Sequence, residues 1–346
     1  MLDVKISSRG SGRNLNLSQF LGNEVNEWEG CRFWVNSPVK RADVWIVIED
    51  LDDDDVECEV PTDAVLFASA ETSWVPGFFD TDPDNVRFLD QFAWIYTCHD
   101  VYRKNVTASL PFLPWMVNAN HGPSISAPHH RNLDFLRELR NVEKTEELSV
   151  ICSTQTATEG HRQRLRFVTA LKEHFGERLH WYGNGVNPIE EKWSGLAQYR
   201  FTVAIENQVA DNVVTEKLWD PLLTWTVPLY VGAPNAIDYV PSNAMRLLSL
   251  QDINGSISTV EQLLNGDEYS GFVPHLAEAR DRLLGPLHLY TRLANLARQH
   301  QSSSAAELVR LTPRDHLALG QARRRRPWSM LRSRSGELLK TLGSEK

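Results

Sequence analysis

Short apolar runs rich in Val, Ile and aromatic residues recur along the chain, and each predicts a β-strand. Segments with apolar residues at helical spacing lie between several of these runs, such as residues 162–175, where Leu165, Val168 and Leu171 share one face. Strands that alternate with helices are typical of an α/β protein with parallel sheets. The expected strands are residues 44–48, 64–68, 92–97, 148–152, 179–182, 201–205, 227–231 and 247–250.

The length of the chain predicts two domains. A chain of 346 residues, 42% of them hydrophobic, can bury two cores of ordinary size. Residues 118–131, NANHGPSISAPHHR, are dense in Asn, Gly, Ser, Pro and His and predict a linker or a cleft loop. We therefore divide the chain into a first domain at residues 1–145, a second domain at residues 146–320 and a basic tail at residues 321–346.

The charge is unevenly distributed between these parts. The tail holds eight basic and two acidic residues while the whole chain has a net charge of −9, so residues 1–320 carry −15. A strongly acidic body argues against nucleic acid as the main partner. The tail also places Trp328 and several leucines beside its cations, which suits peripheral contact with an anionic membrane surface, although a solvated terminus is the slightly favoured interpretation.

Targeting and redox signals are few. The chain has no apolar leader and no run of about 18 apolar residues, so we expect a cytoplasmic protein, with the tail as an optional contact to the inner membrane face. The cysteines form no Cys-x-x-Cys pair, which favours reduced core thiols over a metal site. They are Cys31, Cys58, Cys98 and Cys152.

Residues 200–241 hold the most informative polar positions. The predicted strand 201–205 ends at Glu206 and Asn207, and Thr215 can cap a helix that begins with Glu216 and Lys217. The free N–H groups of a helix start and a lysine ammonium suit a diphosphate, while carboxylates and an amide suit sugar and nucleoside groups. This pattern indicates a nucleotide-sugar site. On spacing alone, an ordinary helix cap with a surface Glu-Lys pair fits equally well.

The same segment resembles, nearly end to end, the donor-binding block of the α-1,3/4-fucosyltransferase family. That block has an aromatic residue four positions before an apolar-Glu-Asn sequence, then a loop, Tyr-x-Thr-Glu-Lys, a helix and a Val-Pro-x-x-x-Gly strand. The family tyrosine is replaced by Val213, so its nucleoside contact must be absent or supplied elsewhere. The matching positions are Phe201, Ile205, Glu206, Asn207, Thr215, Glu216, Lys217, Val227, Pro228, Gly232 and Pro234.

The resemblance implies the GT-B fold, in which two Rossmann-like domains face each other across a cleft, and GDP-fucose as the donor. Animal members of the family carry a membrane anchor, so this sequence resembles a bacterial-type member. The acceptor implied is a GlcNAc-containing oligosaccharide such as LacNAc, an N-glycan core or a chito-oligosaccharide, with fucose attached through an α-1,3 or α-1,4 linkage. The residues do not decide between these acceptors or linkages, and the oligomeric state is also open.

A second phosphate-binding element is expected after the strand 148–152. The loop STQTATEG leads into a helix that carries Arg162 and Arg164 near its start. From the residues alone, arginines on an exposed helix face are the favoured interpretation. The family has an arginine three residues before an aromatic residue that contacts the diphosphate, and Arg164 before Phe167 is similar to it. The resemblance therefore implies Arg164 as the diphosphate ligand, with Arg162 second.

The catalytic base is expected on the first domain. Inverting transfer needs a carboxylate that takes the proton from the acceptor hydroxyl, and Glu71 follows a predicted strand at the edge that faces the cleft. Glu71 also resembles a strand-terminal glutamate of the family, although its neighbours differ and a surface glutamate is the alternative. Trp74 and Phe78 are candidates for stacking on the acceptor sugar, although core packing is the commoner fate of such aromatics.

No metal site is predicted. The acidic runs at residues 52–55 and 80–84 superficially resemble the Asp-x-Asp motif of the other main glycosyltransferase fold, but a hydrated acidic loop is favoured. We expect no obligatory cofactor, with Mn²⁺ or Mg²⁺ at most stimulating. The resulting hypothesis is an inverting α-1,3-fucosyltransferase. The alternatives are a related transferase that uses another nucleotide sugar for surface polysaccharide, and an inactive carbohydrate-binding protein.

Overall fold

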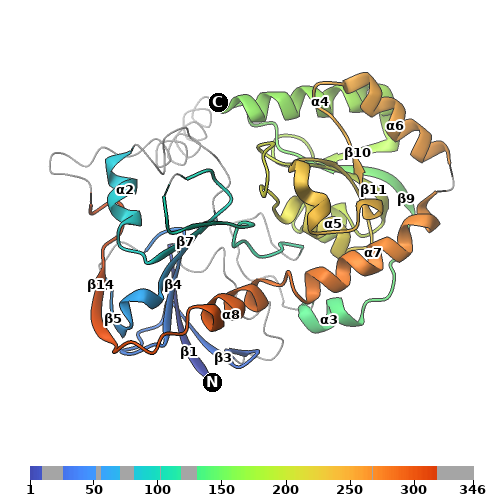
Figure 1. Ribbon diagram of the computed structural model, residues 1–346. Helices are drawn as coiled ribbons and strands as arrows, with labels where there is room; N and C mark the ends of the chain where they lie inside the picture. Colours follow the sequence, from blue (N-terminus) through green and yellow to red (C-terminus); the bar gives the residue numbers. More distant parts are fainter. Residues whose placement is uncertain are drawn as a thin grey trace, which may run out of the picture.

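Two parallel sheets organise the chain, as a computed structural model shows (Figure 1). The structure describes residues 1–9, 26–51, 56–70, 82–101, 103–117, 131–266 and 268–317. Within these residues the first sheet has seven strands in the order β2-β3-β1-β4-β6-β7-β8, parallel except for the β2-β3 pair. Its strands are β1 (Leu2–Ser8), β2 (Glu27–Trp28), β3 (Cys31–Val35), β4 (Val44–Ile48), β6 (Val65–Ala68), β7 (Trp94–Thr97) and β8 (Val106–Ala108).

The second sheet is parallel throughout, with strand order β10-β9-β11-β12-β13. Its strands are β9 (Glu146–Ile151), β10 (Leu179–Tyr182), β11 (Tyr199–Ile205), β12 (Val227–Val231) and β13 (Arg246–Leu247). Every residue of β12 is buried, as expected for a strand with helices on both faces. The helices α4 (Glu159–Phe175) and α6 (Ile253–Asn265) lie along one flank of this sheet, and α5 (Glu216–Leu223) and α7 (Tyr269–Leu284) lie along the other (Figure 1).

The remaining elements lie outside the two parallel sheets. They are β5 (Val56–Val60), the helices α2 (Pro83–Leu89), α3 (Leu133–Glu138) and α8 (Leu289–Gln299), the strand β14 (Glu307–Leu311), and the 3-10 turns η1 (Thr62–Ala64), η2 (Gly176–Arg178), η3 (Lys192–Gly195), η4 (Pro234–Asp238) and η5 (Ser242–Ala244). The α/β prediction is confirmed, and β4, β10 and β12 have the predicted bounds.

The chain returns to the first sheet after α7, which the division at residues 146–320 did not anticipate. The strand β14 pairs antiparallel with β5, and α8 packs beside the first sheet. The indole ring of Trp28 stacks on His288 with ring centroids 4.5 Å apart, and Trp28 Nε1 donates to Thr291 Oγ1 at 3.0 Å. The buried apolar face of α8 explains the return, because Leu289, Leu293 and Leu296 need a hydrophobic surface to cover.

Several sequence predictions lie outside the described residues. They include Glu71, Trp74, Phe78 and the basic tail, so their proposed roles stay predictions. The structure does place the start of this region, because the parallel strand β6 ends at Ala68 and the Ala70 backbone N–H donates to Glu49 Oε2 at 3.0 Å. All four cysteines are buried. Among the described residues, the helices are all too short or too polar to span a bilayer.

Candidate donor site

The turn between β11 and α5 forms the centre of the site. Thr215 is the N-cap of α5, as predicted, and its hydroxyl accepts a hydrogen bond from the backbone N–H of Lys217 at 3.3 Å. Glu206, directly after β11, is 2% exposed. Its carboxylate accepts from the backbone N–H and from the hydroxyl of Thr215, both at 2.8 Å. Burial raises the pKa of Glu206, and the charge of Lys217 opposes the rise. Glu206 therefore fixes the start of α5 from behind.

Two lysines converge on Glu216, the first residue of α5. Lys217 Nζ lies 3.1 Å from Glu216 Oε1, and Lys192 Nζ lies 3.4 Å from the same oxygen. Burial opposes ionisation of Glu216, but these two cations hold its pKa well below the ordinary value. Lys217 is partly buried, yet Glu216 and Glu206 raise its pKa. Both residues are therefore charged at neutral pH.

Lys192 is shared with a second carboxylate. Its Nζ lies 2.9 Å from Asp220 Oδ2, while Asp220 Oδ1 accepts from the backbone N–H of Met116 at 2.7 Å. Met116 lies in the segment that leaves the first sheet. Burial raises the pKa of Asp220 to about 6, although Lys192 favours its charged form. This network joins the connection from the first domain to the start of α5.

The start of α4 supplies the opposite wall. Thr158 caps α4 by accepting from the backbone N–H of His161 at 3.1 Å. Arg164 is 7% exposed, and its Nε has no hydrogen-bond partner among the described residues. Arg162 instead pairs with Glu159 at 2.8 Å and does not line the cavity described below. Of the two arginines proposed from the sequence, Arg164 is the one that the fold brings to the site.

Glycines allow the loops of this site to approach each other closely. A Cβ on Gly160 would lie 2.5 Å from the carbonyl oxygen of Asn207, so the start of α4 touches the loop after β11. Asn207 Oδ1 is buried and has no hydrogen-bond partner in the described part of the chain. Gly183 has φ +136° and lies against the Cys152 carbonyl, so the turn after β10 packs closely on the end of β9.

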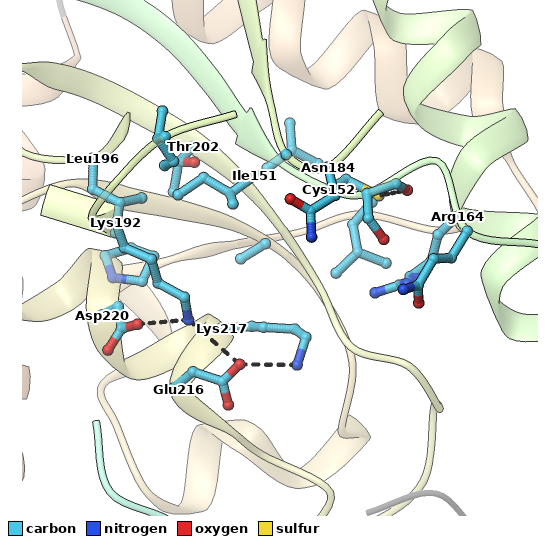
Figure 2. Close-up of a pocket in the computed structure, with 18 residues that line it drawn as sticks. Ile151, Cys152, Arg164, Asn184, Lys192, Leu196, Thr202, Glu216, Lys217 and Asp220 are labelled. Carbon is cyan, nitrogen blue, oxygen red and sulfur yellow. Dashed lines mark hydrogen bonds and ion pairs between the residues drawn. The ribbon is translucent and has the colours of Figure 1, made fainter. Parts of the chain in front are cut away.

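These elements enclose a cavity of about 250 Å³ at the carboxyl ends of β9 and β11 (Figure 2). Three of the predicted donor residues, Arg164, Glu216 and Lys217, line it, whereas Glu206 and Thr215 support it from behind. The lining residues are Ile151, Cys152, Ser153, Gln155, Arg164, Gly183, Asn184, Ile189, Lys192, Leu196, Thr202, Val203, Ala204, Ile205, Glu216, Lys217, Asp220 and Pro221.

Sequence analysis missed Lys192 and Asp220. Lys192 follows two glutamates in a polar stretch that resembles a surface loop. One signal was available, because Glu216 and Asp220 are four residues apart and therefore share a helix face. Two carboxylates at that spacing repel each other unless a cation lies between them, which could have indicated a lysine from elsewhere in the chain.

Part of the chain is similar in sequence to known proteins. Residues 142–253 match the family described as glycosyltransferase family 10 (fucosyltransferase) C-term. GDP-fucose protein O-fucosyltransferase 3 from Gallus gallus is 39% identical over 83 residues, which are 22% of this chain and 17% of that protein. The Bos taurus protein of the same name is 51% identical over 53 residues, 15% of this chain and 11% of that protein. The chain thus spans less than a fifth of these relatives.

A solved structure described as α1,3-fucosyltransferase with GDP-fucose has a TM-score of 0.50 and 14% sequence identity, and the match covers 88% of this chain and 91% of that one. This likeness supports the fold, and the prediction of the GT-B class is confirmed. Residues 142–253 are thus similar to the carboxy-terminal domain of glycosyltransferase family 10, the fucosyltransferases.

Proposed function

We propose that the protein is a fucosyltransferase that uses GDP-fucose as its donor. The observation that carries the proposal is the convergence of Arg164, Lys217 and Glu216 on one cavity inside the segment that matches family 10. Arg164 disfavours the charged form of Lys217, so the two cations face the same region without full compensation. A diphosphate between them would relieve that repulsion, because each cation would gain an anionic partner.

The chemistry of each residue indicates which group of the donor it binds. Arg164 and Lys217 bind the diphosphate and neutralise the charge that develops as it leaves, which removes the need for an obligatory metal. Mn²⁺ or Mg²⁺ at most stimulates transfer. Glu216 accepts from sugar hydroxyls, and Asn207, whose buried Oδ1 has no partner among the described residues, meets a polar group of the nucleoside or sugar.

Transfer proceeds with inversion in this proposal. Glu71 takes the proton from the acceptor hydroxyl while that oxygen displaces GDP, so the β-linked donor yields an α-linked product. The acceptor is a GlcNAc-containing oligosaccharide joined through an α-1,3 linkage, with Trp74 and Phe78 stacking on it. This acceptor rests on the family resemblance of the sequence.

A second acceptor class has its own support. The chicken and bovine relatives are named protein O-fucosyltransferases, so the hydroxyl of a protein side chain is the other candidate. The donor site is the same in both cases, and only the surface that presents the acceptor differs. A transferase that uses another nucleotide sugar for surface polysaccharide and a carbohydrate-binding protein without turnover are the remaining alternatives.

Two measurements test the proposal. In a thermal-shift series with GDP, UDP and CMP at equal concentration, GDP should raise the melting temperature most. Its Kd should be micromolar, which corresponds to a binding free energy of roughly −7 to −8 kcal/mol. Labelled GDP-fucose is then offered to LacNAc, an N-glycan core, a chito-oligosaccharide and folded protein domains. Preference for UDP or CMP contradicts the donor. GDP-fucose binding without transfer to any acceptor supports the binding-protein alternative.

A further inference from the structure

Lys192 is a buried cation that the assigned donor roles do not use. It begins the turn η3 and its side chain is 9% exposed, compared with 26% for Lys217. Figure 2 shows its ammonium group between Asp220 and Glu216 at one end of the cavity. Two carboxylates already surround this one positive charge. Lys192 is therefore a poor candidate for a further diphosphate ligand.

The anchoring of Asp220 decides what Lys192 does. One oxygen of Asp220 is held by the Met116 backbone N–H at 2.7 Å and the other by Lys192 at 2.9 Å. Both carboxylate oxygens of Asp220 are thereby held, and Asp220 in turn fixes the ammonium group of Lys192. The ammonium then reaches Glu216 from a rigid support rather than from a flexible side chain.

Glu216 receives both of its cations on the same oxygen. Lys192 and Lys217 engage Oε1 at 3.4 and 3.1 Å, so a ligand hydroxyl that donates to this carboxylate has Oε2 to meet. In the proposed function Lys217 also binds the diphosphate, whereas Lys192 has no such second task. Lys192 is thus the cation that can keep Glu216 oriented and ionised throughout donor binding.

We infer that Lys192 is a positioning residue that, through the Asp220 anchor, holds Glu216 in place for the hydroxyl groups of the donor sugar. The inference rests on the proposed function and deepens it, because it makes sugar recognition depend on a residue outside the Thr-Glu-Lys sequence. GDP alone lacks the fucose, so its affinity should not depend on Lys192. The affinity of GDP-fucose does.

The test is a double-mutant cycle measured by titration calorimetry with GDP and with GDP-fucose. The proteins are the wild type, Lys192→Met, Glu216→Gln and the double variant. Lys192→Met should weaken GDP-fucose about 10-fold more than GDP, and this selective loss should disappear in the Glu216→Gln background. If Lys192 had only a structural role, Lys192→Met would weaken the affinity for GDP and for GDP-fucose equally. The affinity losses of the two single variants would then multiply in the double variant. Either of those results overturns the inference.

Two further arms keep the result interpretable. Lys144→Met removes a partly buried lysine just before β9, which donates to Ala197 O, Thr224 O and Thr226 Oγ1 away from the cavity. This control should lower the melting temperature without separating GDP from GDP-fucose. If Lys192→Met does not fold, Asp220→Asn removes the anchor instead and enters the same cycle with Glu216→Gln.

The outcomes also separate this inference from the proposed function. Wild-type protein that binds neither GDP nor GDP-fucose overturns both. Wild-type protein that prefers GDP-fucose, combined with independent effects of Lys192 and Glu216, overturns the positioning role alone. A pH series adds a second readout, because Lys192→Met leaves two adjacent carboxylates that would share a proton. Between about pH 5 and 8, the GDP-fucose affinity of the variant should depend more strongly on pH than that of the wild type, in which Lys192 favours the charged form of both carboxylates.

Discussion

The carboxylate of Glu206 is bonded twice to Thr215, through its backbone N–H and its hydroxyl, each at 2.8 Å. Because Thr215 caps α5, this pair holds the helix start that presents Glu216 and Lys217 to the cavity. A glutamate that appears from the sequence to be a ligand thus also has a structural task. The two tasks can be separated by measuring stability and ligand affinity on the same variants.

Glu206→Ala is the first of these variants. It leaves the buried N–H and hydroxyl of Thr215 without their acceptor, so the free energy of unfolding should fall by about 2–4 kcal/mol. Glu206→Gln retains one acceptor oxygen and should recover part of this loss. Glu278→Gln, which removes an exposed ion pair with Arg282, is the control and should change stability by less than about 0.5 kcal/mol. Equal urea midpoints for Glu206→Ala and the control would contradict the structural role.

The cation pair gives the second prediction. Lys217→Ala and Arg164→Ala should each lower turnover by about 100-fold, because each removes a positive charge from the leaving diphosphate. Arg166→Ala is matched to Arg164→Ala, since Arg166 lies on the same helix but is 69% exposed and paired with Glu159. That control should retain near-native turnover. A folded Arg164→Ala protein with the activity of the control would exclude Arg164 from the diphosphate site.

The sequence predicts a strand when the residues of that strand alone indicate how it is buried. The runs at β4, β10 and β12 have the predicted bounds because consecutive apolar residues are typical of strands covered on both faces. The pair β5 and β14 was missed for the opposite reason. In β5, exposed charged residues such as Glu57 and Glu59 alternate with buried ones. Its partner strand, β14, is some 250 residues away in the chain.

The same distinction explains the site. Glu206, Thr215, Glu216 and Lys217 are close in sequence, so a local motif finds them together. Lys192 reaches Asp220 from a separate 3-10 turn, and only the packing of η3 against α5 brings them within 2.9 Å. Periodicity identifies the face of a helix. It does not identify which distant cation neutralises that face.

His288 gives a prediction about pH. It is fully buried against Trp28, and burial, with a smaller contribution from Arg137, lowers its pKa to about 3. The unfolded chain takes up this proton near pH 6.5 and the folded chain does not, so stability is lost as pH falls below about 6.5. Between pH 7 and pH 5 this one group should remove about 2 kcal/mol from the free energy of unfolding.

Urea denaturation of His288→Phe tests this directly. The variant keeps a ring against Trp28 and lacks the titrating group, so each protein is compared with its own stability at pH 7. Between pH 7 and 5 the variant should lose about 2 kcal/mol less than the wild type. Parallel pH profiles for the two proteins would assign the acid sensitivity to other residues.

Glu71 gives the last prediction, and it concerns the chemical step. The strand β6 ends at Ala68, so the chain enters the region of Glu71 from the carboxyl edge of the first sheet. In the proposed function, a base on the first domain lies at that edge, where it can meet a donor bound by the second sheet. Glu71→Gln should retain GDP affinity, because the proposed donor residues come from the other domain. It should lower transfer by about 10² to 10⁴-fold, because an amide cannot take the acceptor proton.

If the variant instead loses GDP affinity and keeps turnover of bound donor, Glu71 is a ligand rather than a base. Asp100, which follows β7 and is exposed, is then the next carboxylate to replace.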